Sequence, residues 1–259
     1  IEKLKSIEFN KIPNIKRGTG GSTCTPLKYW MDKKSWSLSS AARYRGFGMA
    51  GYHIGDKMIT FGGSSVHPQI KNNNFVELFH WLERNRYLSG IQLSDEKLVQ
   101  HTEEMLKYKP KFIYGYSSSL YIWADYLKRN GITPNFLQAV FPTSEILLPH
   151  YKSTIESGFG CDTYNSYGAR DGNIYTSECK EHNGLHISVE LSVVEVVNPK
   201  TNKKTEGLGE ILLTDLHNFT FPFVRYRIGD IGVLSKQKCS CGRGLPLLKE
   251  IIGRSGDIM

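Results

Sequence analysis

The chain has 259 residues and a formal net charge of +8, and 39% of its residues are hydrophobic and 22% charged. This composition is that of a globular protein large enough to bury a substantial core. No apolar run approaches the length of a membrane-spanning helix and no segment is repetitive, so a membrane span and a repeat architecture are excluded.

The basic residues are scattered along the chain, which favours an anionic small-molecule ligand and predicts no nucleic-acid partner. The chain has five cysteines, an odd number, and it shows no secretory signal. This pattern argues against a disulfide framework and predicts reduced thiols in the cytoplasm. Because the sequence starts at Ile1 and stops within a motif, we expect it to be a fragment of a longer protein.

The first part of the chain contains signals for several helices. Asp32 is a candidate N-cap for a helix that extends to residue 48, after a loop of glycines and hydroxyl side chains at residues 17–26, RGTGGSTCTP. Ser94 is a candidate N-cap for a helix that stops before Pro110. Two more helices are expected, one from residue 117 to a closing glycine at 131 and one over residues 149–158.

Strands are expected between these helices, at residues 57–63, 112–116 and 137–145. Their alternation with helices predicts an α/β lobe with a largely parallel sheet over residues 1–160. Later residues show almost no helical periodicity, and strands are expected within 185–199, 209–216, 221–228 and 230–235. Residues 161–259 are therefore expected to form a β-rich lobe.

Four polar stretches follow the glycine loop, each at the expected end of a strand. They are PTSE (142–145), TYNSYGARDG (163–172), RYRIGDIG (225–232) and IGRSGDIM (252–259). A glycine and hydroxyl loop suits phosphate oxygens, because backbone N–H groups and hydroxyls can point inward. Ligands of α/β proteins gather at strand ends, so the set predicts a nucleotide site at the junction of the two lobes.

These stretches resemble the motifs of the adenylate-forming ligases, in particular the phenylacetate-CoA ligase family and its capsular-polysaccharide-biosynthesis relatives. TGGSTCTPL is similar to the family's phosphate loop, SYGARDG to its Y-G-x-x-E motif, RYRIGD to Y-R-x-G-D and GRSGD to the G-R-x-D-D hinge. The segment IYGYSSSLYIWADYL is similar to a further stretch of this branch. The resemblance covers nearly the whole chain. It implies the large N-terminal core of such a ligase, an α/β lobe followed by a β-rich lobe, without the C-terminal domain.

The resemblance also implies a role for each motif. The phosphate loop would wrap the β- and γ-phosphates of ATP with Thr19, Gly20, Gly21, Ser22 and Thr23. Tyr167 and Gly168 would contact the adenine, with Ser144 and Glu145 near the base. Asp171 would bind Mg²⁺ and act in catalysis together with Thr19, Ser22 and Thr23. Asp230 would accept hydrogen bonds from the ribose, Arg254 would lie near the ribose and phosphate, and Asp257 would lie at the hinge.

Three positions depart from the family's motifs. Cys24 stands where the phosphate loop usually has its last glycine, Asp171 stands where the family has Glu, and Gly256 replaces the first acid of the hinge pair. No base is evident beside Cys24, so its role as a catalytic thiol is disfavoured. The departures motivate an alternative, a divergent or inactive adenylate-forming fold that binds nucleotide without turnover.

A group of cysteines and histidines occurs in the β-rich lobe. Cys179, Cys239 and Cys241 with one imidazole would form a Cys₃His set, which suits tetrahedral Zn²⁺ in a structural role. Both His182 and His186 follow Cys179 in the sequence. Resemblance to the family's sequence around GLHI favours His186. The competing interpretation is a set of reduced surface thiols.

The resulting hypothesis is an ATP-dependent carboxylate–CoA ligase. It would join a carboxylic acid to AMP with release of pyrophosphate and then transfer the acyl group to CoA, with Mg²⁺ assisting the first step and Zn²⁺ holding the structure. One alternative is the inactive nucleotide-binding fold. The other is a zinc-stabilised nucleic-acid-binding module, whose support is the net charge of +8, the cysteine pairs and the 12% aromatic residues.

Overall fold

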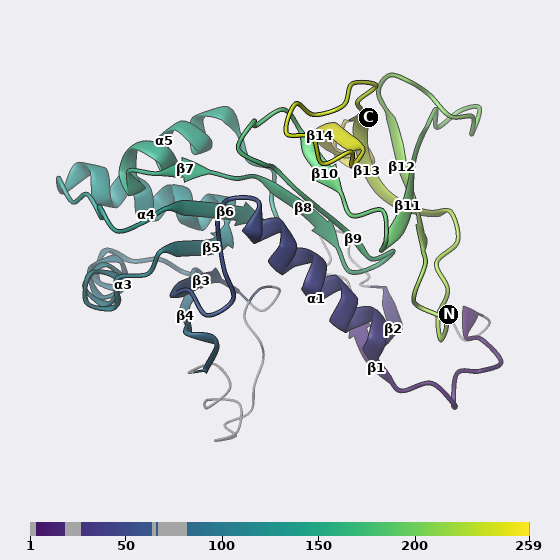
Figure 1. Ribbon diagram of the computed structural model, residues 1–259, viewed down its shortest axis with the longest axis horizontal. Coiled ribbons are helices and arrows are strands. Elements are labelled where there is room, and N and C mark those ends of the chain that lie inside the picture. Colours follow the sequence, from purple (N-terminus) through teal and green to yellow (C-terminus); the bar gives the residue numbers. More distant parts are fainter. Residues whose placement is uncertain (1–3, 19–26, 64–65, 67–81, 259) are drawn as a thin grey trace. The chain divides into compact units, whose positions relative to one another are not determined.

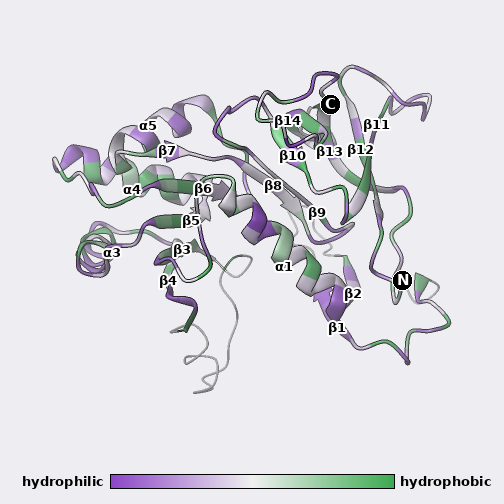
Figure 2. Cartoon of the chain, viewed as in Figure 1, coloured by the Kyte–Doolittle hydropathy of each residue, from purple (hydrophilic) through white to green (hydrophobic). Residues whose placement is uncertain are grey.

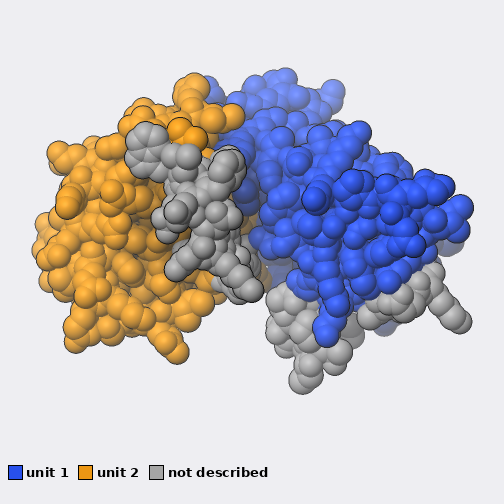
Figure 3. Space-filling view, turned by 90° about the horizontal axis from the view of Figure 1, so that it is seen from below, with its two compact units in different colours: residues 1–49, 167–259 blue, residues 50–166 orange. Residues whose placement is uncertain are grey.

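The computed structural model describes residues 4–18, 27–63, 66 and 82–258 (Figure 1). The predicted phosphate loop from Thr19 to Thr23, together with Cys24, lies outside the described residues. The chain divides into two compact units, unit 1 with residues 1–49 and 167–259 and unit 2 with residues 50–166 (Figure 3). The sequence-based division at residue 160 differs from this one, because helix α1 (Lys33–Gly48) packs against strand β9 (Ile174–Ser177) of the later segment.

Unit 2 is built on a five-stranded sheet with the order β4-β3-β5-β6-β7. Its strands are β3 (Met58–Gly62), β4 (Asn85–Ser89), β5 (Phe112–Tyr116), β6 (Ala139–Thr143) and β7 (Asp162–Thr163). Each strand of this sheet is parallel to the strands beside it, which confirms the parallel sheet expected from the sequence. Every residue of β3 and β6 is buried, as the continuous apolar pattern of a parallel sheet requires.

Local sequence signals set the helices of unit 2, which are α3 (Asp95–Tyr108), α4 (Ser117–Arg129) and α5 (Pro149–Phe159). The Ser94 side chain caps α3 by accepting a hydrogen bond from the Lys97 N–H at 3.4 Å. Helix α5 starts with its proline and ends at Gly160, whose φ of 69° is left-handed. Hydrophobic and hydrophilic residues alternate along α4 and α5 (Figure 2), which lets each helix bury one face.

Trp123 of α4 lies at the centre of the unit 2 core. Its side chain is fully buried and packs against the rings of Phe61 and Phe159. The indole Nε1–H donates to the Thr102 hydroxyl at 3.0 Å, so the one polar atom of the ring is satisfied. The same cluster joins helices α3, α4 and α5 to the sheet.

Unit 1 begins with an antiparallel hairpin of β1 (Asn14–Gly18) and β2 (Lys28–Asp32), which leads directly into α1. Asp32 occupies the N-cap position that the sequence predicted, but its side chain does not cap α1. Instead its carboxylate accepts hydrogen bonds from the N–H groups of Phe219 at 3.0 Å and Thr220 at 3.1 Å. Asp32 therefore ties the start of the helix to the C-terminal segment of the unit.

The rest of unit 1 is a seven-stranded sheet with the order β11-β12-β13-β14-β10-β9-β8. Besides β9, its strands are β8 (Ser166–Ala169), β10 (Leu185–Ile187), β11 (Ser192–Val197), β12 (Gly209–Asp215), β13 (Tyr226–Leu234) and β14 (Leu247–Arg254). The pairings from β11 to β14, and those of β10 with β14 and β9, are antiparallel. A short helix, α6 (Ser255–Ile258), follows β14.

Three expectations about this sheet require correction. The run from 185 to 199 forms two strands, because the chain turns where the Leu191 N–H bonds the Ser188 carbonyl at 3.0 Å. Residues 226–234 form one continuous strand, so Asp230 lies inside β13 and not in a turn after it. The strand expected to end near residue 252 runs to Arg254 as β14, and it lies between β13 and β10, a position that the sequence did not predict. Among the described residues, no helix has the length and apolar character needed to cross a membrane.

Candidate functional site

Asp230 is the centre of a polar cluster in unit 1. Its Oδ2 accepts a hydrogen bond from the Tyr167 hydroxyl at 2.7 Å, and its Oδ1 lies 3.1 Å from Nε of Arg254. Arg254 is also held by the Ile228 carbonyl, to which Nη1 donates at 2.8 Å. The structure thus brings together three residues that the sequence predicted for nucleotide binding.

The sheet explains why these residues meet. Asp230 on β13 is the direct cross-strand partner of Arg254, the last residue of β14. The pairing of β12 with β13 shifts register between Glu210 and Leu212, and Gly229 within this bulge has a φ of 81°. Glycine adopts this left-handed conformation without strain, and a bulge re-aims the side chains beside it. The glycine of the RYRIGD stretch therefore serves a bulge rather than the expected turn.

Asp171 lies in the turn after β8 and contacts a second tyrosine. The Tyr226 hydroxyl donates to Oδ2 of Asp171 at 3.0 Å. Sequence reasoning gave Tyr226 no role, although it lies in the same RYRIGD stretch as Asp230. The sequence did offer a signal for Tyr226. It is a tyrosine at the start of the strand that carries Asp230, and a tyrosine hydroxyl in such a place commonly finds a hydrogen-bond partner.

Burial controls the electrostatics of this cluster. It raises the pKa of Asp230, and the hydrogen bond from Tyr167 and the charge of Arg254 offset only part of that shift. Burial also raises the pKa of Asp171 against the bond from Tyr226. The pKa of Tyr167 lies well above its usual value because of burial and the neighbouring Asp230, so its hydroxyl remains a donor. A buried and a partly buried carboxylate in this setting favour hydroxyl donors or a cation as partners.

Ser144 and Glu145 belong to unit 2, where they follow β6. The Glu145 carboxylate accepts from the Ser118 N–H at 2.8 Å, and its carbonyl accepts from the Ser117 hydroxyl at 3.2 Å. Glu145 therefore caps the start of α4, a structural role that the sequence did not suggest. The position of both residues near the adenine stays a prediction.

Gly168 and Asp257 are the remaining predicted positions. A Cβ on Gly168 would lie 3.2 Å from the Ile174 carbonyl oxygen, so glycine allows β8 and β9 to approach closely. Asp257 lies in α6, and its side chain is outside the described part of the chain.

The structure also brings together the four predicted zinc ligands, Cys179, His186, Cys239 and Cys241. Their ligand atoms all lie within 4.8 Å of one another. The sulfurs of Cys179 and Cys239 are 3.7 Å apart, and the Cys241 sulfur is 3.5 Å from Nε2 of His186. Two ligands bound tetrahedrally at about 2.3 Å from one ion are about 3.8 Å apart, so the set fits Zn²⁺.

The sheet again explains the arrangement. His186 on β10 pairs with Ser177 of β9 on one side and with Leu247 of β14 on the other. Cys179 follows β9, and Cys239 and Cys241 precede β14, so both segments meet beside β10. His182, the alternative ligand, instead has its Nδ1 3.0 Å from the Glu178 carboxylate.

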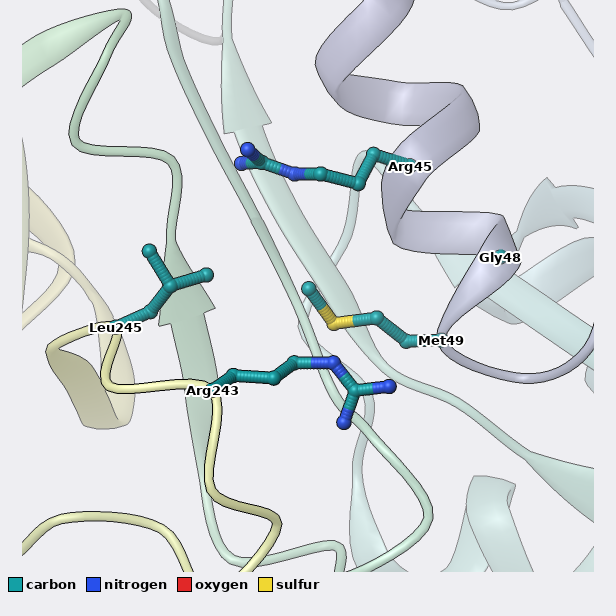
Figure 4. Close-up of a pocket in the computed structure, with 5 residues that line it drawn as sticks. All are labelled: Arg45, Gly48, Met49, Arg243 and Leu245. Carbon is teal, nitrogen blue, oxygen red and sulfur yellow. The ribbon is translucent and has the colours of Figure 1, made fainter.

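A cavity of about 530 Å³ lies in unit 1 between the end of α1 and the loop before β14. Figure 4 shows Arg45, Gly48 and Met49 from the helix side and Arg243 and Leu245 from the loop side. Met49 also packs against the cysteine cluster. The residues that line this cavity include none of those predicted for nucleotide binding, so it is separate from the Asp230 cluster.

No protein-family model matches the sequence. Among curated proteins, Protein CapK of Staphylococcus aureus is 26% identical over 271 aligned positions, which cover 100% of this chain and 56% of that protein. Phenylacetate-coenzyme A ligase of Thermus thermophilus is 28% identical over 159 residues, covering 59% of this chain and 36% of that protein. The chain therefore spans about half the length of the relative that it matches throughout.

Solved structures share the fold. A 2-hydroxyisobutyryl-CoA ligase in complex with 2-HIB-AMP and CoA superposes with a TM-score of 0.74 at 20% identity, covering 95% of this chain and 54% of that one. A long-chain-fatty-acid-CoA ligase from Archaeoglobus fulgidus gives a TM-score of 0.63 at 14% identity, with 92% and 51% covered. These likenesses confirm the expected ligase fold. The named relatives and the shared fold therefore agree with the resemblance of the sequence to the adenylate-forming ligases.

Proposed function

We propose that this protein activates a carboxylic acid with ATP to form an acyl-adenylate and then transfers the acyl group to CoA. The observation that carries the proposal is the cluster in which Asp230 contacts both Tyr167 and Arg254. Support also comes from the fold of 2-hydroxyisobutyryl-CoA ligase, whose structures contain an acyl-AMP and CoA.

Each residue of the cluster has a chemical part in this proposal. The Asp230 carboxylate accepts hydrogen bonds from the ribose hydroxyls, and Arg254 keeps that carboxylate oriented. Tyr167 offers its ring to the adenine. Asp171 supplies a carboxylate oxygen, the type of ligand that Mg²⁺ prefers, and its bond from Tyr226 fixes its orientation. A Mg²⁺ ion held there would supply positive charge to offset the negative charge of the phosphates.

We also propose that Cys179, His186, Cys239 and Cys241 hold a structural Zn²⁺. Three sulfurs and one imidazole nitrogen are the four donors that a structural Zn²⁺ takes, and such an ion would have no position open for a substrate. The ion would supply a cross-link between the segment after β9 and the loop before β14. Cytoplasmic location, where thiols stay reduced, is consistent with this donor set and belongs to the same proposal.

The test of the proposed function is exchange of labelled pyrophosphate into ATP by the complete natural protein, measured across a panel of carboxylic acids. Exchange that depends on one class of acid is the expected result, and CoA should then yield the corresponding thioester. Binding of ATP without exchange for any acid would instead favour the inactive nucleotide-binding fold. That alternative is motivated by Asp171, whose side chain is one methylene shorter than the Glu of the resembled motif.

A further inference from the structure

Two guanidinium groups in unit 1 converge on one aromatic ring. Cζ of Arg17 lies 4.1 Å from the centroid of the Trp36 ring, and Cζ of Arg170 lies 5.0 Å from it. Arg17 comes from the end of β1, Trp36 from the first turns of α1, and Arg170 from the turn after β8. Segments distant in the sequence thus bring two positive charges to the same place, beside Asp171.

Tyr29 joins this group from the neighbouring strand. It is the direct cross-strand partner of Arg17 in the β1–β2 hairpin, so the two side chains lie on the same face. The Tyr29 ring contacts Phe223, which in turn contacts Tyr226, the donor to Asp171. Arg17, Tyr29 and Arg170 therefore surround the same corner of the unit that holds Asp171.

Two buried polar atoms of this group are unsatisfied. Nε of Arg17 and the hydroxyl of Tyr29 are both buried and have no hydrogen-bond partner among the described residues. Tyr29 is only 1% exposed, and water is therefore not at hand to replace a partner. Burial and then the charge of Asp171 raise the pKa of Tyr29 above its usual value, so the hydroxyl keeps its proton as a donor.

The positive charges of Arg17 and Arg170 repel each other. Burial, and next the proximity of Arg170, lowers the pKa of Arg17 below the usual arginine value. Like charges repel, and buried donors without acceptors destabilise a fold. An anion with several acceptor oxygens, such as a phosphate group, removes both penalties at once.

We propose that Arg17, Tyr29 and Arg170 form a phosphate-receiving subsite that binds the phosphates of ATP beside Asp171. This inference rests on the proposed function, in which ATP is the nucleotide. The two guanidinium groups supply charge and paired N–H donors, and Tyr29 supplies a single O–H donor. Trp36 holds the guanidinium groups in place through cation–π contacts. Tyr29 and Arg170 thereby gain a role in recognising the phosphates, while Asp230 and Tyr167 recognise the nucleoside.

The test uses calorimetric binding of ATP, inorganic pyrophosphate and adenosine to the complete natural protein. Arg17→Gln and Arg170→Gln each remove one charge, and Tyr29→Phe removes one hydroxyl and keeps the ring packed against Phe223. Arg129→Gln is the matched control, because Arg129 is exposed and its ion pair is with Asp125 on its own helix. Losing one charged hydrogen-bond partner should weaken ATP and pyrophosphate binding roughly ten- to hundredfold in the arginine variants.

The Tyr29→Phe variant distinguishes a loss of phosphate binding from a loss of stability. Because the buried hydroxyl has no hydrogen-bond partner among the described residues, its loss should leave the melting temperature unchanged or raise it, while it weakens ATP and pyrophosphate binding by roughly three- to tenfold. Adenosine affinity should be unchanged in all variants. Equal loss of adenosine and ATP affinity, or ATP binding unaffected by all three substitutions, overturns the subsite and leaves the proposed function standing. Binding of ATP and pyrophosphate that depends on Arg17, in a protein that shows no acid-dependent pyrophosphate exchange, supports the subsite and removes the proposed function.

Discussion

Removal of the proposed zinc ion should destabilise unit 1 by several kcal/mol. Cys179 and Cys239 are 60 positions apart in the sequence. In the chain-entropy treatment of cross-links, closing a loop of that length stabilises the folded state by about 4 kcal/mol at 25 °C. For a domain of roughly 150 residues, such a change lowers the melting temperature by about 8 to 16 °C. Binding of zinc to the unfolded chain would reduce this effect.

Thermal unfolding before and after addition of a chelator measures the effect, on protein purified without added zinc and analysed for its metal content. Cys179→Ser should reproduce the loss, because it removes a fully buried ligand. Cys161→Ser is the control, since Cys161 is a free thiol of unit 2 outside the cluster. Sub-stoichiometric zinc in the purified protein, or equal shifts for the two variants, would refute the zinc cross-link.

Three further predictions concern single positions. Asp230→Ala should weaken nucleotide binding by roughly 1–3 kcal/mol in calorimetry, because it removes an acceptor for the ribose; unchanged affinity would exclude Asp230 from the site. Burial raises the pKa of Asp171, so its contribution to stability is present below the usual aspartate pKa and is lost as the pH rises through the raised value. Asp171→Asn should therefore remove this part of the pH dependence of the melting temperature, and an unaltered profile would contradict it. Gly158→Ala should destabilise the protein by about 1–3 kcal/mol or more in denaturant unfolding, because its Cβ would lie 2.3 Å from the Ala124 carbonyl oxygen. Gly48→Ala, where nothing lies within 4 Å, should instead be neutral or slightly stabilising.

The parallel sheet and its helices could be predicted from sequence because their signals are local. Ser94 caps α3 and a proline starts α5, and both act within one turn of the helix end. The same local reasoning fails for β14, whose place between β13 and β10 depends on partners far along the chain. It also fails for Gly229, because a left-handed glycine fits a turn and a bulge equally well.

The residues of the candidate site also fall into those that the sequence predicted and those that depend on the folded structure. Motif order indicated Tyr167, Asp230 and Arg254, but the contact between Tyr167 and Asp230 joins positions 63 apart and follows only from the sheet. Arg17 and Tyr29 carried no signal of their own, since a basic residue and a tyrosine on a hairpin are common. Their significance comes from two buried polar atoms, Nε of Arg17 and the hydroxyl of Tyr29, that have no hydrogen-bond partner among the described residues, which is a property of packing.

The position of β14 has a consequence for how the chain folds during synthesis. Strands β8 to β10 form one part of the unit 1 sheet and β11 to β13 another, and only β14 pairs with both β10 and β13. Until residues 247–254 leave the ribosome, each part has an unpaired edge that can capture other chains. A truncation before Leu247 should therefore yield aggregation rather than a smaller folded domain. Cys239 and Cys241 emerge just ahead of β14, so the thiol cluster and the joining strand become available at nearly the same moment.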